Sequence, residues 1–227
     1  MRNFRHRGGY NGTGEKDCLT IMVGNHNIAL LNLSMSGSFD EVLGIWDTNY
    51  DITVQDCILG GGDDAGERYG ILCSNYNRRV TYFGNLIHDS CYRMPAVGYD
   101  VSDTVAAPSL TADVVCNVIW KYETMGVTVY HGGKANVRNN YFYTVVYPGV
   151  AWRAVNVETL GEAYASGNYS RDGASTSGSV GTIFAVDAYA QISALTPAQA
   201  LARVQNIAGC RVGGLDAYDQ AVLAGVV

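Results

Sequence analysis

A six-residue segment of alternating apolar and polar residues recurs along most of the chain, and four of its six copies end in asparagine. The copies start at residues 28, 52, 80, 112, 135 and 163, so the spacing between them is irregular and lies in the twenties and low thirties. Periods of this kind are typical of solenoids, in which each repeat is one coil and the insertions form loops on one face. The segments themselves are Ile28–Leu33, Ile52–Cys57, Val80–Asn85, Ala112–Asn117, Ala135–Asn140 and Ala163–Asn168.

The period inside each copy decides which kind of solenoid the repeats form. Alternation over five or six residues indicates strands, and no copy shows sustained helical spacing. Asparagine suits the tight turn after such a strand, because it tolerates left-handed backbone angles and bonds to its own backbone. The final column, with Asn85, Asn117, Asn140 and Asn168, therefore predicts a stacked ladder of side-chain amides. Scattered loop asparagines in a β-sandwich are the alternative.

Length and composition fit one all-β domain over residues 1–227, a parallel β-helix of six to eight coils. The chain has 48% hydrophobic residues, 16% charged residues and 27 glycines, which is typical of a turn-rich β protein. The net charge of −6 argues against a nucleic-acid partner. No apolar run reaches the roughly 18 residues of a membrane span, so we expect no membrane partner.

The six cysteines form no CxxC pair, which gives a zinc or thioredoxin-type site little support. Cys57 falls in the ladder column and Cys116 beside it, and free buried thiols are the preferred interpretation, with disulfides as the alternative. Residues 2–7 alternate and predict a strand that ends at Gly8. A strand that begins at residue 2 has no coil beneath it. We therefore expect that an amino-terminal coil or cap of a longer parent protein is missing, or that the first coil pairs with another chain.

The carboxy-terminal segment 196–209 predicts one amphipathic helix. Thr196 suits the N-cap, Pro197 the first helical position and Gly209 the stop. We expect this helix to cover the end or side of the solenoid, with the rest of the tail following the coil surface.

Four segments, in this order along the chain, resemble motifs of the pectate lyases with a right-handed parallel β-helix. They are residues 27–41 (NIALLNLSMSGSFDE), 85–95 (NLIHDSCYRMP), 133–142 (GKANVRNNYF preceded by Gly132) and the tail around 206–219. The resemblance covers nearly the whole chain and implies a calcium-dependent lyase. Such an enzyme cleaves a 1,4-linked polyuronate by β-elimination, and acts outside the cell as a monomer on acidic polysaccharide.

The resemblance also implies site residues. Arg93 matches the arginine of the family's Arg-x-Pro motif, as proton acceptor or, because a guanidinium is a poor base, as transition-state stabiliser. Asp40 matches an acidic calcium ligand, Glu41 follows it, and Asp17 matches an acid one coil earlier. Because neighbouring strand residues point to opposite faces, we favour Asp40 over Glu41. A loop arginine paired with Asp89, and solvated acids at strand ends, are the alternatives.

Arg68, Tyr69 and Tyr92 are candidate substrate-binding residues, because a cation and aromatic rings can hold an anionic sugar. The chain departs from the family at Leu31-Asn32, in place of Asp-His, and at residues 96–98, where a second arginine is expected. Asp63-Asp64 is a possible source of replacement ligands.

Two further functions remain open. A polysaccharide-binding β-helix, such as an adhesin or a lyase relic, would keep the surface without the chemistry. A hydrolase would need two or three aspartates in one groove at glycosidase spacing, and Asp47, Asp56 and Asp63-Asp64 are the available ones.

Overall fold

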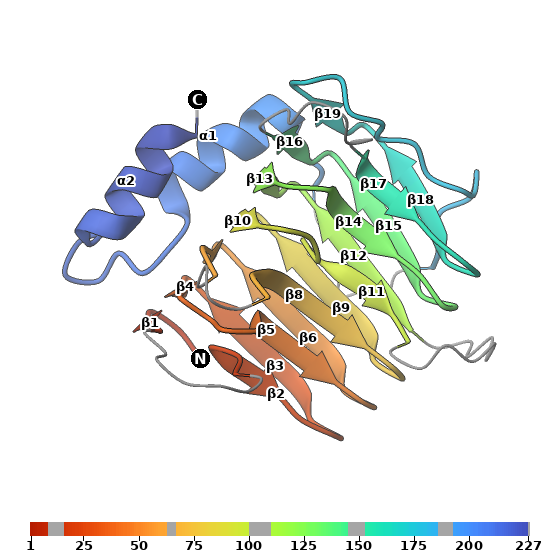
Figure 1. The fold of residues 1–227 in the computed structure, drawn as a ribbon, viewed down its shortest axis with the longest axis horizontal. Coiled ribbons are helices and arrows are strands. Elements are labelled where there is room, and N and C mark those ends of the chain that lie inside the picture. The colour runs from red at the N-terminus through yellow and green to blue at the C-terminus, as the bar shows by residue number, and fades with distance from the viewer. Residues whose placement is uncertain (9–15, 63–66, 100–109, 145–152, 186–192, 227) are drawn as a thin grey trace.

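The computed structural model describes residues 1–8, 16–62, 67–99, 110–144, 153–185 and 193–226. Over these residues the chain forms a parallel β-helix with three sheets, and each coil adds one strand to each sheet in turn (Figure 1). The predicted all-β solenoid is therefore confirmed.

All strand pairs that join consecutive coils are parallel. The first sheet contains β2 (Leu19–Ile21), β5 (Glu41–Trp46), β8 (Tyr69–Ser74), β11 (Ala96–Gly98), β14 (Met125–Val129) and β17 (Arg153–Val157). The second sheet contains β3 (His26–Leu31), β6 (Tyr50–Gln55), β9 (Arg78–Phe83), β12 (Thr111–Val115), β15 (Lys134–Arg138) and β18 (Glu162–Ser166). The third sheet contains β1 (Arg5–Arg7), β4 (Ser34–Ser36), β7 (Ile58–Gly60), β10 (Leu86–Ser90), β13 (Val118–Tyr122), β16 (Tyr141–Tyr143) and β19 (Tyr169–Ser170).

The register of the second sheet matches the alignment of the six repeats. Ile28 pairs with Ile52, Ile52 with Val80, and the series continues without a shift to Ala163. Six stacked strands are joined by five full turns, so the solenoid has about five turns. The expected six to eight coils was therefore slightly too high, because part of the carboxy-terminal sequence forms helices instead of coils.

The predicted asparagine ladder is present at the turn between the second and third sheets. The Nδ2 atoms of Asn85, Asn117 and Asn140 each donate to Oδ1 of the next asparagine, at 3.0–3.1 Å. Each of these accepting Oδ1 atoms also accepts a hydrogen bond from the backbone N–H of the ladder asparagine one coil earlier. A second, shorter ladder joins Asn49 and Asn77 at the turn after the first sheet, and the sequence alignment did not predict it.

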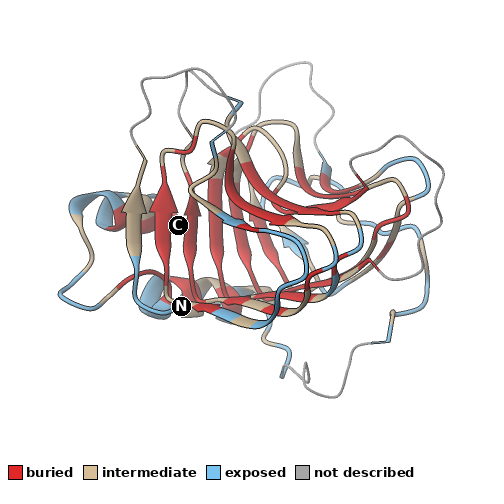
Figure 2. Cartoon of the chain, turned by 90° about the horizontal axis from the view of Figure 1, so that it is seen from below, coloured by how far each residue is buried: buried red, intermediate tan, exposed pale blue. Residues whose placement is uncertain are grey.

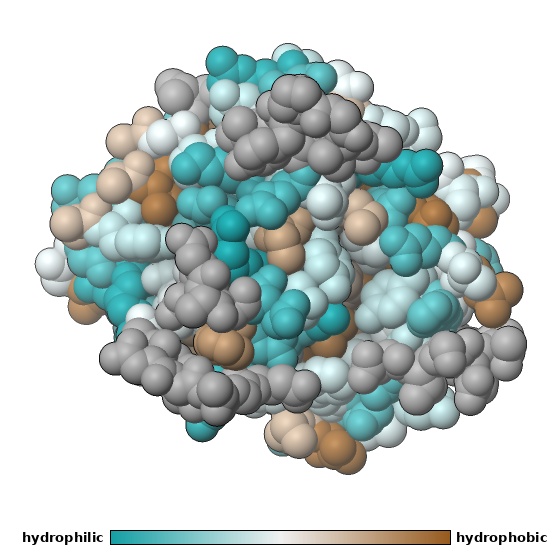
Figure 3. All heavy atoms as spheres, in the orientation of Figure 1, coloured by the Kyte–Doolittle hydropathy of each residue, from teal (hydrophilic) through white to brown (hydrophobic). Residues whose placement is uncertain are grey.

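The interior between the sheets is filled by stacked aliphatic and aromatic side chains. The strands in the middle of the solenoid are buried along most of their length, whereas the terminal strands β1, β3 and β18 are more exposed (Figure 2). All six cysteines are free, and four of them are buried, as the preferred interpretation expected. At the amino terminus the strand is shorter than predicted: β1 spans Arg5–Arg7, and Arg2 forms an isolated bridge with Leu31. On the face shown in Figure 3, hydrophilic side chains surround small, separate hydrophobic groups.

Two helices lie against the third sheet (Figure 1). The first, α1 (Pro197–Ile207), begins as predicted, because the Thr196 hydroxyl accepts from Gln199 N and Gln199 bonds back to Thr196 N. It covers the side of the solenoid, where the buried Asp56 carboxylate accepts two hydrogen bonds of 2.8 Å from Arg203. No described helix has the length and apolar character to cross a bilayer.

The second helix, α2 (Ala217–Gly225), was not predicted, since the tail was expected to follow the coil surface. It is held by four charged residues from the two ends of the chain: Arg7 contacts Asp216 at 2.9 Å and Asp219 at 2.7 Å, and Arg5 lies 3.2 Å from Asp216. Asp219 is fully buried. The amino-terminal strand and the carboxy-terminal helix therefore stabilise each other.

Gly61 lies against the side chain of Tyr218 from α2. Its φ is +66°, and a Cβ there would overlap the Tyr218 hydroxyl. We expect Gly61→Ala to lower the free energy of unfolding by about 2 kcal/mol, because left-handed strain and displacement of Tyr218 add together. Urea denaturation measures this loss, and limited proteolysis reports release of the helix.

Gly173→Ala is the matched control. Gly173 has a similar φ of +73° but open space around the missing side chain, so it should lose only the backbone part, ~1 kcal/mol. Equal losses in the two variants would show that Tyr218 packing contributes nothing.

Candidate functional site

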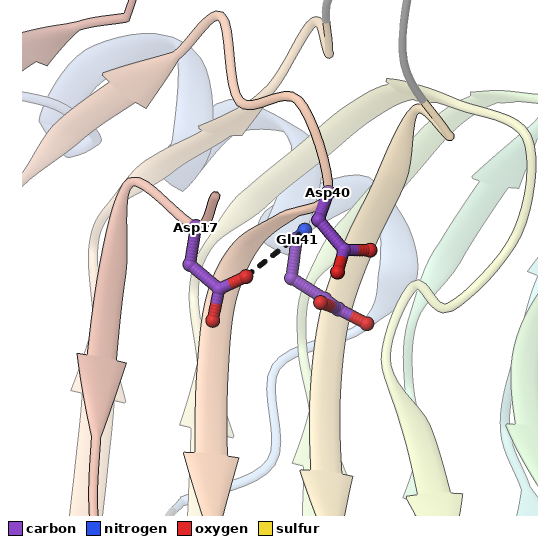
Figure 4. Close-up of side chains that lie close together, drawn as sticks. All are labelled: Asp17, Asp40 and Glu41. Atoms are coloured by element: carbon purple, nitrogen blue, oxygen red, sulfur yellow. Dashed lines mark hydrogen bonds between the residues drawn. The ribbon is translucent and has the colours of Figure 1, made fainter. Parts of the chain in front are cut away.

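Three acidic side chains meet at the start of two neighbouring strands of the first sheet. Asp17 precedes β2, Asp40 lies in the bend before β5, and Glu41 is the first residue of β5. One oxygen from each carboxylate lies within 4.8 Å of the other two (Figure 4). We call these residues the acidic cluster.

Asp40 was preferred to Glu41 as a calcium ligand because neighbouring residues of a strand point to opposite faces. That argument does not apply, because only Glu41 belongs to the strand. Asp40 lies outside the strand, so the backbone bend turns its side chain toward that of Glu41 (Figure 4). Both therefore join Asp17 in the cluster. Glu41 is the most deeply buried, with 1% of its surface exposed, whereas the other two are partly exposed.

Short contacts position the Asp17 carboxylate. Its Oδ2 accepts from the Thr20 hydroxyl at 2.8 Å, and its Oδ1 accepts from Glu41 N at 3.3 Å. A Cβ at residue 44 would overlap Asp17 Oδ2 and lie 2.8 Å from Trp46 Nε1, so Gly44 leaves the space that the carboxylate needs. Burial raises the pKa of Asp17, and the Thr20 hydrogen bond and the Arg93 charge oppose that rise.

Arg93 forms an ion pair with Glu41 through Nη1 and Oε1. The Asp89 carboxylate, suggested as an alternative partner, lies 3.6 Å from Lys121 and 3.9 Å from Arg68, so that interpretation is not supported. The pair joins residues 52 positions apart in the sequence. Sequence reasoning named both residues for the site but did not predict their contact.

The predicted substrate-binding tyrosines surround the same guanidinium. The Arg93 Cζ atom lies 4.0 Å from the centroid of the Tyr69 ring and 5.3 Å from that of Tyr92. The two rings are 4.7 Å apart and inclined at 60°. The Tyr69 hydroxyl donates to Glu67 at 2.6 Å, and burial, helped by this bond, raises the pKa of Tyr69.

Arg68 has different neighbours. Its guanidinium lies 2.6 Å from Glu123 and 3.9 Å from Asp89, and 27% of its side chain is exposed. These contacts place it beside Asp89 of β10 and Glu123, which follows β13 one coil later.

The structure also locates the residues at which the chain differs from the pectate lyase motifs. Leu31-Asn32 lies at the end of the second sheet, where Asn32 Nδ2 donates to Ile207 O of α1, whereas the acidic cluster lies on the first sheet. Ala96 and Val97 are buried in β11. Among the aspartates considered for a hydrolase, Asp56 accepts hydrogen bonds from Arg203, and Asp63-Asp64 lies outside the described residues.

The chain matches no family model and no curated protein sequence. The resemblance to pectate lyases therefore rests on the motifs and on the parallel β-helix. The acidic cluster and its surroundings bring together three carboxylates, the Arg93 guanidinium and two tyrosine rings near the start of the first-sheet strands.

Proposed function

We propose that this protein is a pectate lyase-like polysaccharide lyase that cleaves 1,4-linked polyuronate by calcium-assisted β-elimination. The observation that carries the proposal is the acidic cluster with Arg93 paired to its most buried member. The fold supports it, since a parallel β-helix of this kind is what the resemblance implies. A secreted location, where pectin is found, goes with this function.

The donor set fits the proposed cation. Calcium takes six to eight oxygen ligands, and Asp17, Asp40 and Glu41 offer carboxylate oxygens within 4.8 Å of one another. Three carboxylates and one guanidinium leave an excess of negative charge when all are ionised. Calcium, when bound, would supply a positive charge for the carboxylate of the sugar; the remaining ligands would be water and that carboxylate.

The chemistry requires stabilisation of negative charge. Removal of the proton next to a carboxylate places charge on that group in the transition state, and preorganised cations stabilise it. Arg93 fits this stabilising role better than that of the base, because an anionic neighbour favours the protonated guanidinium. Tyr69 and Tyr92 contact the Arg93 guanidinium and offer ring surface for a sugar.

The test is incubation with polygalacturonate, with and without calcium, while the ultraviolet absorbance of the new conjugated double bond is followed. We expect a calcium-dependent rise that Arg93→Ala reduces by at least about 100-fold, the scale of losing one electrostatic stabiliser. Arg79→Ala is the matched control, because Arg79 pairs with Asp51 on the second sheet, away from the acidic cluster. No rise on polygalacturonate, methylated pectin or alginate would refute the lyase function.

A second candidate is a non-catalytic polysaccharide-binding β-helix. Two observations favour it: the position of the family's second arginine is occupied by the buried Ala96 and Val97, and Glu41 already neutralises Arg93. Calcium-dependent retention on immobilised polygalacturonate without any absorbance change would indicate this function.

A further inference from the structure

The Glu41 carboxylate is paired with the guanidinium of Arg93, whereas the proposed function requires the same carboxylate to bind calcium. The Glu41 side chain is only 1% exposed and its carboxylate contacts Arg93 Nη1, while its backbone N–H donates to Asp17 Oδ1 at 3.3 Å. A buried carboxylate needs such a partner, because an isolated charge away from water is costly. A divalent cation that binds this carboxylate would neutralise the negative charge that Arg93 neutralises now, and it would repel the guanidinium.

Arg93 also contacts two aromatic rings, besides the carboxylate of Glu41. Its guanidinium lies 4.0 Å from the centroid of the Tyr69 ring, and Tyr92 adds a second ring at 5.3 Å. The hydrogen bond from Tyr69 to Glu67 fixes the nearer ring. A guanidinium over aromatic faces keeps a favourable contact after it loses its carboxylate. With 21% of its side chain exposed, Arg93 also reaches the surface.

From these contacts we infer that Arg93 and a divalent cation compete for Glu41, and that Arg93 is the element that couples cation binding to sugar binding. Arg93 neutralises Glu41 in the cation-free protein. When a cation takes that carboxylate, Arg93 leaves it, stays against Tyr69 and Tyr92, and becomes available to the carboxylate of a uronate. The inference rests on the proposed function. It predicts that cation and anionic sugar each raise the affinity of the other, since such coupling is reciprocal.

The test compares calcium binding to three full-length proteins by isothermal titration calorimetry at one fixed neutral pH. They are the unmodified protein, Arg93→Met, and Arg79→Met as the matched control, which removes the same charge from a residue paired with Asp51 on the second sheet. We expect Arg93→Met to bind calcium about tenfold more tightly, equivalent to ~1.4 kcal/mol, and Arg79→Met to bind as the unmodified protein does. Equal or weaker calcium binding by Arg93→Met would overturn the inference.

A second measurement needs no variant. Calcium should change the near-ultraviolet circular dichroism of the unmodified protein, because Arg93 shifts against the rings of Tyr69 and Tyr92, and the change should saturate with binding. Saturable calcium binding without this change would mean that Arg93 has not moved, and would overturn the inference even if Arg93→Met does not fold.

The outcomes separate this inference from the proposed function. Calcium-dependent cleavage of polygalacturonate together with equal calcium affinity in the unmodified protein and Arg93→Met would leave the lyase standing and remove the coupling. Absence of saturable calcium binding in both proteins would remove the cation site and the coupling together.

Discussion

Asn117→Ala is expected to lower the free energy of unfolding by about 4 kcal/mol, because several buried partners lose their hydrogen bonds at once. Asn117 is fully buried in the middle of the ladder. Its Nδ2 donates to Tyr82 O at 3.0 Å and to the next asparagine at 3.1 Å. Its Oδ1 accepts from both the backbone and the side chain of Asn85, each at 3.0 Å. Urea denaturation at neutral pH measures the loss.

Asn168→Ala serves as the control for this prediction. Asn168 ends the ladder and is partly exposed, so water can replace part of the hydrogen bonding that its Oδ1 offers to Asn140. Its loss should be about 1–2 kcal/mol. If the two variants lost the same stability, the ladder would have to be a set of independent turns and not a continuous network.

Acid is expected to destabilise the protein through His88, by about 2.5 kcal/mol between pH 7 and pH 4.5. His88 is fully buried under α2, and neither ring nitrogen has a hydrogen-bond partner among the described residues. Its ring centroid lies 6.2 Å from that of Trp120 and 6.1 Å from that of Tyr218. Burial, with smaller effects from the Lys121 and Arg7 charges, lowers the pKa of His88 to about 3.

The direction of this effect follows from the two pKa values. The unfolded chain takes up a proton near the ordinary histidine pKa of ~6.5, whereas the folded chain does so only near pH 3. Stability is therefore complete above about pH 6.5 and falls as the pH drops toward 3. In His88→Phe this part of the pH dependence should vanish.

Chemical denaturation of the unmodified protein and His88→Phe at pH 7 and pH 4.5 measures this difference. The comparison cancels the contribution of groups that both proteins share, such as Asp216, whose pKa is lowered in the folded state. His26→Phe is the matched control, since His26 is exposed and stacks on Tyr50 at 4.7 Å. The same pH slope in His88→Phe and in the unmodified protein would contradict the prediction.

The second sheet shows how much of the fold can be predicted from sequence. Its register was correct for all six repeats, from Ile28 to Ala163, because stacked coils place like residues on like. The pattern is local: alternation identifies the strand and asparagine identifies the turn. Thr196 and Pro197 gave the start of α1 for the same reason, since capping depends on a few adjacent residues.

The second helix shows where local reasoning ends. Asp216 caps α2 by accepting from Asp219 N, a signal that was present in the sequence but weak in so short a helix. What stabilises α2 is the pairing of Asp216 and Asp219 with Arg5 and Arg7, about 210 residues earlier in the chain. No periodicity in the tail encodes that pairing.

The candidate site likewise depends partly on local sequence and partly on the tertiary structure. The sequence determined the repeat, the strands, the ladder and, through the family motifs, the identities of Asp17, Asp40, Glu41 and Arg93. Only the tertiary structure decided that the acids converge and that Arg93 pairs with Glu41. The physical reason is that loops of different length connect the coils, so the direction of a side chain at a coil corner depends on a bend and on neighbours one or two coils away, which local patterns do not specify.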